Sequence, residues 1–210
     1  MTAVFATSRL AIRFARAGAA CALALCGLLA AGLAPAGAEP QFVTTKGDLK
    51  KESWWQVADF HPFTTEVRGI PVGRIKSNWC KATEYRRDLI PKALLNQDGI
   101  DGMAKYKLSF AVEGRFDGSA TRQVALVGVY QECSGRKGRF LLILDQPAEG
   151  QQPKIRFVDA EPTAHQFGAL SVTDGKSIVL STCMECDIGG ILKWNARQRR
   201  FAWVPGKGDD

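Results

Sequence analysis

The chain has 210 residues, a net charge of +7 at pH 7, six cysteines and only two histidines. This length fits a single domain that follows a short N-terminal targeting segment. The basic excess is mild and argues against nucleic-acid binding, which needs a stronger positive footprint.

The first 38 residues have the pattern of a cleavable signal peptide. Three arginines without any acid precede an apolar stretch of Ala, Leu, Gly and Cys, and Ala36-Gly37-Ala38 forms a small-x-small cleavage site. An N-terminal membrane anchor is the alternative, but the apolar stretch is short and rich in glycine for a span. A lipoprotein variant would acylate Cys26. We expect cleavage, no membrane span afterwards, and a periplasmic or secreted protein.

The first part of the remaining chain predicts little regular structure. Residues 39–52 are polar and rich in lysine, which predicts a flexible lead-in to one β-rich domain at residues 53–205. If Trp54 and Trp55 lie in a strand, they point to opposite faces, one to the core and one to the surface. Between residues 77 and 95 apolar side chains recur near a 3.6-residue spacing, which predicts a short helical segment.

Apolar runs bounded by turn residues predict about eight strands after Gly102. They cover residues 106–113, 123–130, 139–145, 155–158, 169–172, 177–181, 191–194 and 200–204. Asp174-Gly175 is a strong hairpin signal. Because the strands lie too close together for crossover helices, the pairing should be antiparallel. We expect an α+β fold, mostly β, with an antiparallel sheet or sandwich, one short helical segment near residues 77–95 and a disordered tail at 206–210.

Four cysteines remain after signal cleavage, namely Cys80, Cys133, Cys183 and Cys186. An even number in an oxidising compartment favours disulfides. Among three possible connectivities we expect Cys80–Cys133 and Cys183–Cys186. A four-thiolate zinc site needs two close pairs, and Cys80 and Cys133 are each alone. We expect no metal and no cofactor.

The pair Cys183-Met184-Glu185-Cys186 has two interpretations. Two close thiols can exchange with disulfides when the first is acidified, as at a helix N-terminus. Here Asp187-Ile188-Gly189-Gly190 and a strand follow, so no helix supplies that effect. A structural clip is the favoured interpretation, and a thiol–disulfide oxidoreductase that uses Cys183 and Cys186 is the alternative.

Residues 112–128 contain an apolar residue, Asp117 and Gly118 ahead of an alternating strand. This segment resembles the FG-GAP or VCBS-type β-repeat, whose acidic loop binds calcium. The resemblance implies blade-like β-sheet and an interaction role. Only Asp117 matches the acidic ligands, because Ser119, Thr121 and Gln123 occupy the other positions, and calcium needs six to eight oxygens. A plain hairpin with an Asp-Gly turn is the alternative.

Nucleophilic catalysis has little support in the sequence. His61 and His165 both lie in loop-like contexts, and there is no Gly-x-Ser-x-Gly elbow. A Ser/His/Asp or Cys/His site can still be assembled by folding. An envelope hydrolase, with a cleft that contains a histidine beside an acid, therefore stays a further alternative.

The final predicted hairpin is the most distinctive surface. Basic and aromatic side chains gather around its turn, namely Lys193, Trp194, Arg197, Arg199, Arg200 and Trp203. Tryptophan and arginine are enriched where interfaces carry binding energy. The alternative is a solvated turn whose tryptophans face the core.

No motif names a reaction, so the leading hypothesis is a non-catalytic binding protein that is exported and stabilised by disulfides. Its partner would be another envelope protein or an anionic envelope polymer.

Overall fold

The computed structural model describes residues 41–95, 99–146, 148, 150–184 and 189–204. The expected signal peptide and the C-terminal tail lie outside these residues. The fold class is confirmed: the protein is mostly β, its sheets are antiparallel, and its helices are short. No helix in the described ranges is both long and apolar enough to cross a membrane.

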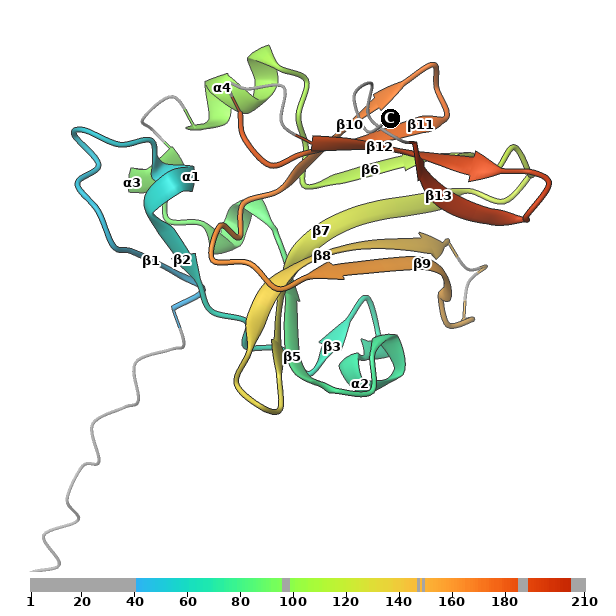
Figure 1. Cartoon of the computed structure of the whole chain (residues 1–210), viewed down its shortest axis with the longest axis horizontal. Coiled ribbons are helices and arrows are strands. Elements are labelled where there is room, and N and C mark those ends of the chain that lie inside the picture. Colours follow the sequence, from blue (N-terminus) through green and yellow to red (C-terminus); the bar gives the residue numbers. More distant parts are fainter. Residues whose placement is uncertain (1–40, 96–98, 147, 149, 185–188, 205–210) are drawn as a thin grey trace, which may run out of the picture. The chain divides into compact units, whose positions relative to one another are not determined.

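The central sheet has five strands. They are β5 (Trp79–Glu84), β6 (Ala111–Gly114), β7 (Gln123–Glu132), β8 (Lys137–Asp145) and β9 (Lys154–Glu161). The order is β5-β7-β8-β9, and the short β6 pairs with the part of β7 that β5 leaves open. β7 and β8 are paired over nearly their whole length. They therefore form the middle of the sheet (Figure 1).

A second sheet is a four-stranded meander. Its strands follow the chain order, β10 (Ala169–Thr173), β11 (Ser177–Ser181), β12 (Gly189–Asn195) and β13 (Arg200–Val204). The Asp174-Gly175 turn predicted from the sequence joins β10 to β11, and both residues have positive φ, 52° and 67°. Two positive φ values match the twist of a tight hairpin. An antiparallel bridge between Ser109 and Leu170 connects this sheet to the chain just before β6.

Alternation along β7 and β8 divides the apolar core into two. Odd-numbered residues such as Val127 and Leu141 belong to the core that includes the inner face of the second sheet, with Leu170, Ile178, Leu192 and Phe201. Even-numbered residues such as Leu126 and Leu142 belong to the other core. That core is covered by β3 (Glu66–Val67), β4 (Ile70–Pro71) and α2 (Val72–Ile75). Burial on both faces explains the continuous apolar run of β8.

The helical segment expected near residues 77–95 is present in the second half of that range. Residues 79–84 form β5, whereas η1 (Arg87–Leu89, 3₁₀) and α3 (Lys92–Leu95) lie within the range and α4 (Gly99–Lys105) follows it. The apolar spacing was misleading in the first half because Trp79 and Ala82 are buried in a bulged strand and Tyr85 is buried directly after it. Extra residues at a bulge change which positions face the core and so mimic a helical period.

Three other segments differ from expectation. The expected lead-in includes β1 (Val43–Thr45), which pairs with β2 (Ala58–Phe60), and Phe42 and Val43 are buried. Residues 54–57 form the helix α1, so Trp54 and Trp55 both pack near Phe167 instead of pointing to opposite faces. The strand expected at 106–113 begins only at Ala111, because α4 extends to Lys105.

The expected disulfide between Cys80 and Cys133 is present and joins β5 to the end of β7, with 4.9 Å between the two Cα atoms. Cys183 is buried and is also disulfide-bonded. Cys186 lies outside the described residues, so its pairing with Cys183 stays a prediction. The oxidoreductase alternative depends on that pair and stays a prediction with it.

Candidate functional site

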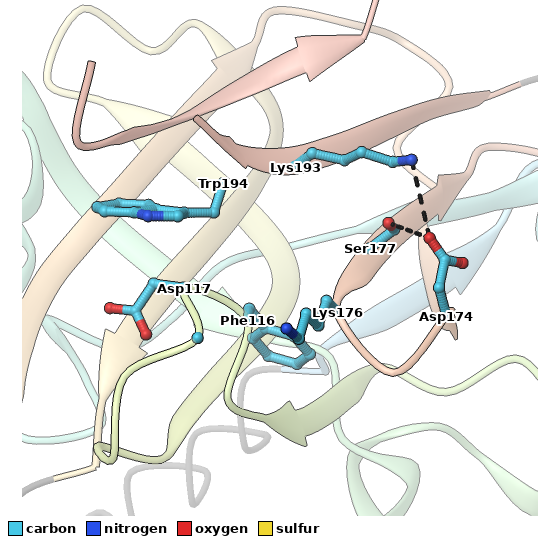
Figure 2. Close-up of a pocket in the computed structure, with 8 residues that line it drawn as sticks. Phe116, Asp117, Asp174, Lys176, Ser177, Lys193 and Trp194 are labelled. Carbon is cyan, nitrogen blue, oxygen red and sulfur yellow. Dashed lines mark hydrogen bonds and ion pairs between the residues drawn. The ribbon is translucent and has the colours of Figure 1, made fainter. Parts of the chain in front are cut away.

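A two-part cleft lies where loops and strands of both sheets meet. Its smaller compartment has a volume of about 330 Å³ and its larger one about 720 Å³. Asp117, Gly118 and Trp194 line both compartments, so the two are adjacent. The lining comes from the β6–β7 loop, the start of β9, the β10–β11 turn, β12 and the β12–β13 turn. We call this the Trp194 cleft, and Figure 2 shows its smaller compartment.

A β-bulge in β9 brings Arg156 into this cleft. Ile143 pairs with Phe157 and the next residue, Leu144, pairs with Ile155, so Arg156 is an extra residue without a partner on β8. As a result Ile155 packs against one core and Phe157 against the other, although residues two apart normally share a face. Bulges of this kind re-aim a side chain, here toward the space between the sheets.

The guanidinium of Arg156 has three partners. It donates to the carboxylate of Asp117 at 3.0 Å and to both oxygens of Asp145 at 3.1 Å. It also lies 5.3 Å from the centre of the Trp194 ring, within the range of a cation–π contact. The side chain is 21% exposed, against 4% for Asp117 and 17% for Asp145. Arg156 is therefore held in place from several sides.

Asp117 is fixed as firmly as its partner. Its Oδ1 accepts the backbone N–H of Ser119 at 2.9 Å, and its Oδ2 accepts from Arg156. The buried Gln123 accepts the backbone N–H groups of Phe116 and Asp117, which closes the loop onto β7. Burial alone would raise the pKa of Asp117. Hydrogen bonds from Gln123 and Ser119 and the charge of Arg156 outweigh it and hold that pKa below its ordinary value.

Trp194 forms the wall that the two compartments share. It lies on β12, where its ring meets Phe201 edge-on at 5.1 Å, and it is only partly buried. In Figure 2 the indole lies close to Asp117, while the neighbouring Lys193 extends in the opposite direction toward Asp174. With Arg156 packed against it, the ring is a rigid aromatic surface inside the cleft.

Positive side chains dominate the lining. Lys154, Arg156 and Arg199 line the larger compartment, and Lys176 and Lys193 line the smaller one. The two acids in the lining are Asp117 and Asp174. They are already engaged, Asp117 by Arg156 and Asp174 by Lys193 at 3.7 Å.

Three of these cations have no counter-ion within the described ranges, namely Lys154, Lys176 and Arg199. Arg199 is held at φ +51° at the end of the β12–β13 turn. All three residues are exposed. Cations that line a cleft without counter-ions create a positive potential, and the cleft focuses this potential. The Trp194 cleft can therefore attract an anion.

The six basic and aromatic residues predicted around the terminal hairpin turn are separated by the fold. Lys193, Trp194 and Arg199 line the cleft. Arg197 is exposed on the turn, and Arg200 donates to the side chain of Gln198. Trp203 lies by β9, where its indole N–H donates to Asp159 and its ring meets Phe157. Arg197, Arg200 and Trp203 are not part of the cleft lining.

Sequence reasoning missed Lys154, Arg156 and Lys176. Nothing in a single sequence marks Arg156, because only the bulge directs it into the cleft. The signals for the other two were weak. Lys154 directly precedes a predicted strand, and Lys176 directly follows the hairpin turn at Asp174-Gly175.

The segment that resembles an FG-GAP repeat forms the β6–β7 hairpin. The acid that it shares with that family, Asp117, is paired with an arginine. Asp117 pairs with Arg156, which lies 39 residues later in the chain. In the described part of the chain, no three His, Cys, Asp or Glu side chains gather as a metal site requires.

The histidines lie elsewhere. His61 contacts Thr44 at 2.9 Å, Lys137 at 3.3 Å and Asp59 at 3.7 Å. His165 is exposed, and its backbone N–H donates to the hydroxyl of Thr163. Neither histidine lines the Trp194 cleft. The hydrolase alternative therefore draws no support from this cleft.

Comparisons with known proteins give no relative for this chain. No family model, curated protein sequence or solved structure matches it.

Proposed function

We propose that this chain is an exported, non-catalytic binding protein and that its Trp194 cleft holds an anionic polymer. The observation that carries the proposal is the charge of the lining. Five lysines and arginines line the two compartments that share Trp194, and the two acids in the lining are already paired.

Export is supported by two features. The first 38 residues have the pattern of a signal peptide. The Cys80–Cys133 disulfide fits an oxidising compartment, where such bonds persist.

The choice of partner follows from the shape and charge of the cleft. Of the two expected partners, an anionic polymer suits two adjacent cationic compartments better than a protein surface does. A polymer can place successive negative charges beside Lys154 and Arg199 in one compartment and beside Lys176 in the other.

The test is to measure the affinity of the protein for long-chain inorganic polyphosphate and for polygalacturonate by isothermal titration calorimetry. The variant K154Q/K176Q/R199Q removes the cations that lack counter-ions. Its matched control is K50Q/K81Q/K92Q, which removes the same charge from exposed positions that do not line the cleft. We expect the cleft variant to weaken binding by at least about tenfold and the control by less than about twofold, because distant surface charges are screened by salt.

Two results would refute the proposal. One is that neither polymer binds at an ionic strength of about 0.05 M, where screening is weak. The other is that both triple variants lose affinity equally, since binding would then depend on the overall charge and not on the cleft.

A further inference from the structure

We infer that the ligand of the Trp194 cleft is an acidic polysaccharide, a chain in which sugar rings carry carboxylate groups. This inference rests on the proposed function and goes beyond it. It assigns the ring of Trp194 to a sugar ring and the unpaired cations to the acidic groups on both sides of that ring.

The first step is that Arg156 supports the site and is not available to the ligand. Its guanidinium already meets two carboxylates and one face of Trp194. An arginine held in this way has little freedom to turn to a new anion. The role of Arg156 is to fix the indole of Trp194 through the cation–π contact, while its hydrogen bonds link the ring to Asp117 and Asp145. The cations left for a ligand are Lys154, Arg199 and Lys176.

The second step is that the cations and the aromatic ring share the lining. Lys154 and Arg199 line the larger compartment and Lys176 the smaller one, while Trp194 lines both. A ligand that occupies both compartments therefore meets cations in each of them and the indole in both. A chain of rings that carry anionic groups has the chemistry that matches this lining.

The third step concerns hydrogen bonding. Ser119 and Thr121 line the larger compartment together with Trp194, and the Ser119 hydroxyl accepts the backbone N–H of Thr121. An aromatic ring and hydroxyl-bearing residues in one lining suit a sugar, whose ring has an apolar C–H face and a rim of hydroxyls. Polyphosphate has charge but no ring. It would use the cations and make no ring contact with Trp194.

The test separates charge from stacking. The probes are an oligogalacturonate, which has one carboxylate on each sugar ring, and a long-chain inorganic polyphosphate. The variants are W194L and W194F, with W203L as a tryptophan control outside the cleft lining. The thermal unfolding midpoint of each variant shows whether it is folded. W194F keeps an aromatic ring and most of the packing against Phe201, so it tests stacking even if W194L is destabilised.

We expect W194L to weaken oligogalacturonate binding about tenfold, which is the scale of one lost ring-stacking contact, with W194F in between. We expect the same variants to change polyphosphate binding by less than about twofold, because charge alone would hold that polymer. The tryptophan fluorescence change on oligogalacturonate binding should persist in W203L and be lost in W194F.

Some outcomes would overturn this inference and leave the proposed function intact. One is that polyphosphate binds in the cleft and oligogalacturonate does not. Another is that W194L leaves oligogalacturonate binding unchanged while K154Q/K176Q/R199Q abolishes it. If neither probe binds, the proposed function itself fails.

Discussion

Replacing Arg156 by methionine should destabilise the protein through the acids that it leaves behind. Methionine keeps an apolar stem against Trp194 but removes the hydrogen bonds to Asp117 and Asp145. Those side chains are only 4% and 17% exposed. A carboxylate at such a position loses most of its hydration and needs a partner.

The size of the loss in unfolding free energy depends on how deeply Arg156 and its two carboxylate partners are buried. Exposed ion pairs contribute about 0–1 kcal/mol, whereas removing one partner of a buried pair costs about 3–5 kcal/mol. Arg156 is 21% exposed and its partners are less so, which places the network between these limits. We expect the free energy of unfolding at pH 7 to fall by about 2–3 kcal/mol.

The pH dependence identifies the cause. In the native protein the pKa of Asp117 is lowered. Its ionised form therefore stabilises the fold above the unfolded pKa of about 4, and this stabilisation is lost as the pH falls through the folded pKa. Without Arg156 the pKa of Asp117 rises. The difference in stability between R156M and the native protein should therefore shrink between pH 7 and about pH 3.

The assay is urea unfolding followed by far-ultraviolet circular dichroism at several pH values, since tryptophan fluorescence would also report the changed environment of Trp194. D117N and the double variant complete a mutant cycle, for which we expect a coupling energy of about 1 kcal/mol or more. A loss below about 1 kcal/mol at pH 7 would show that the network is an ordinary surface ion pair. A loss that does not change with pH would show that packing, not charge, is the cause.

Three further substitutions test the fold that positions the cleft. C80S/C133S should lower the free energy of unfolding by about 4 kcal/mol, because the disulfide closes a loop over a separation of 53 residues. Urea unfolding under non-reducing conditions measures this loss, and a loss below about 1 kcal/mol would contradict the expectation. G128A should lower the free energy of unfolding by about 1–3 kcal/mol through overpacking, since a Cβ there would lie 2.4 Å from the carbonyl oxygen of Thr83 and 2.6 Å from the ring of Phe140. G73A is the control, because a Cβ at Gly73 would enter open space. Equal thermal unfolding midpoints for the two variants would refute this reasoning. T83V should lower the free energy of unfolding by about 1–3 kcal/mol, because the Thr83 hydroxyl accepts the backbone N–H groups of Phe63 and Thr64 and valine would leave both unpaired. Amide hydrogen exchange at Phe63 and Thr64 should become faster. Unchanged exchange at both residues would argue against this role of Thr83.

The sequence predicts the strands well where a local pattern and its structural cause coincide. Asp174-Gly175 predicts its hairpin because positive φ is a property of those two residues themselves. The apolar run of β8 predicts a strand because both faces of that strand are buried. Residues 79–84 were read as helical because a bulge in β5 disturbs the alternation, and its pairing with β7 involves residues about fifty positions later.

The cleft is harder to predict because distant segments form it. Asp117 is noticeable in the sequence as part of an Asp-Gly loop, but its partner Arg156 lies in another strand and reaches it only because of the β9 bulge. The terminal hairpin includes Trp194 and Arg199, which both line the larger compartment of the cleft. The same pattern includes Trp203, which the twist of β13 places against β9 and Asp159 instead. Composition identifies basic and aromatic residues, and only the fold selects which of them share a cleft.

The most direct test of the central claim is the affinity of the protein for an oligogalacturonate, compared between K154Q/K176Q/R199Q and its matched control K50Q/K81Q/K92Q. We predict binding that weakens by at least about tenfold in the cleft variant and stays within about twofold in the control, because only the cleft cations contact the ligand. Equal affinities for the two variants would contradict the claim that the Trp194 cleft is the binding site.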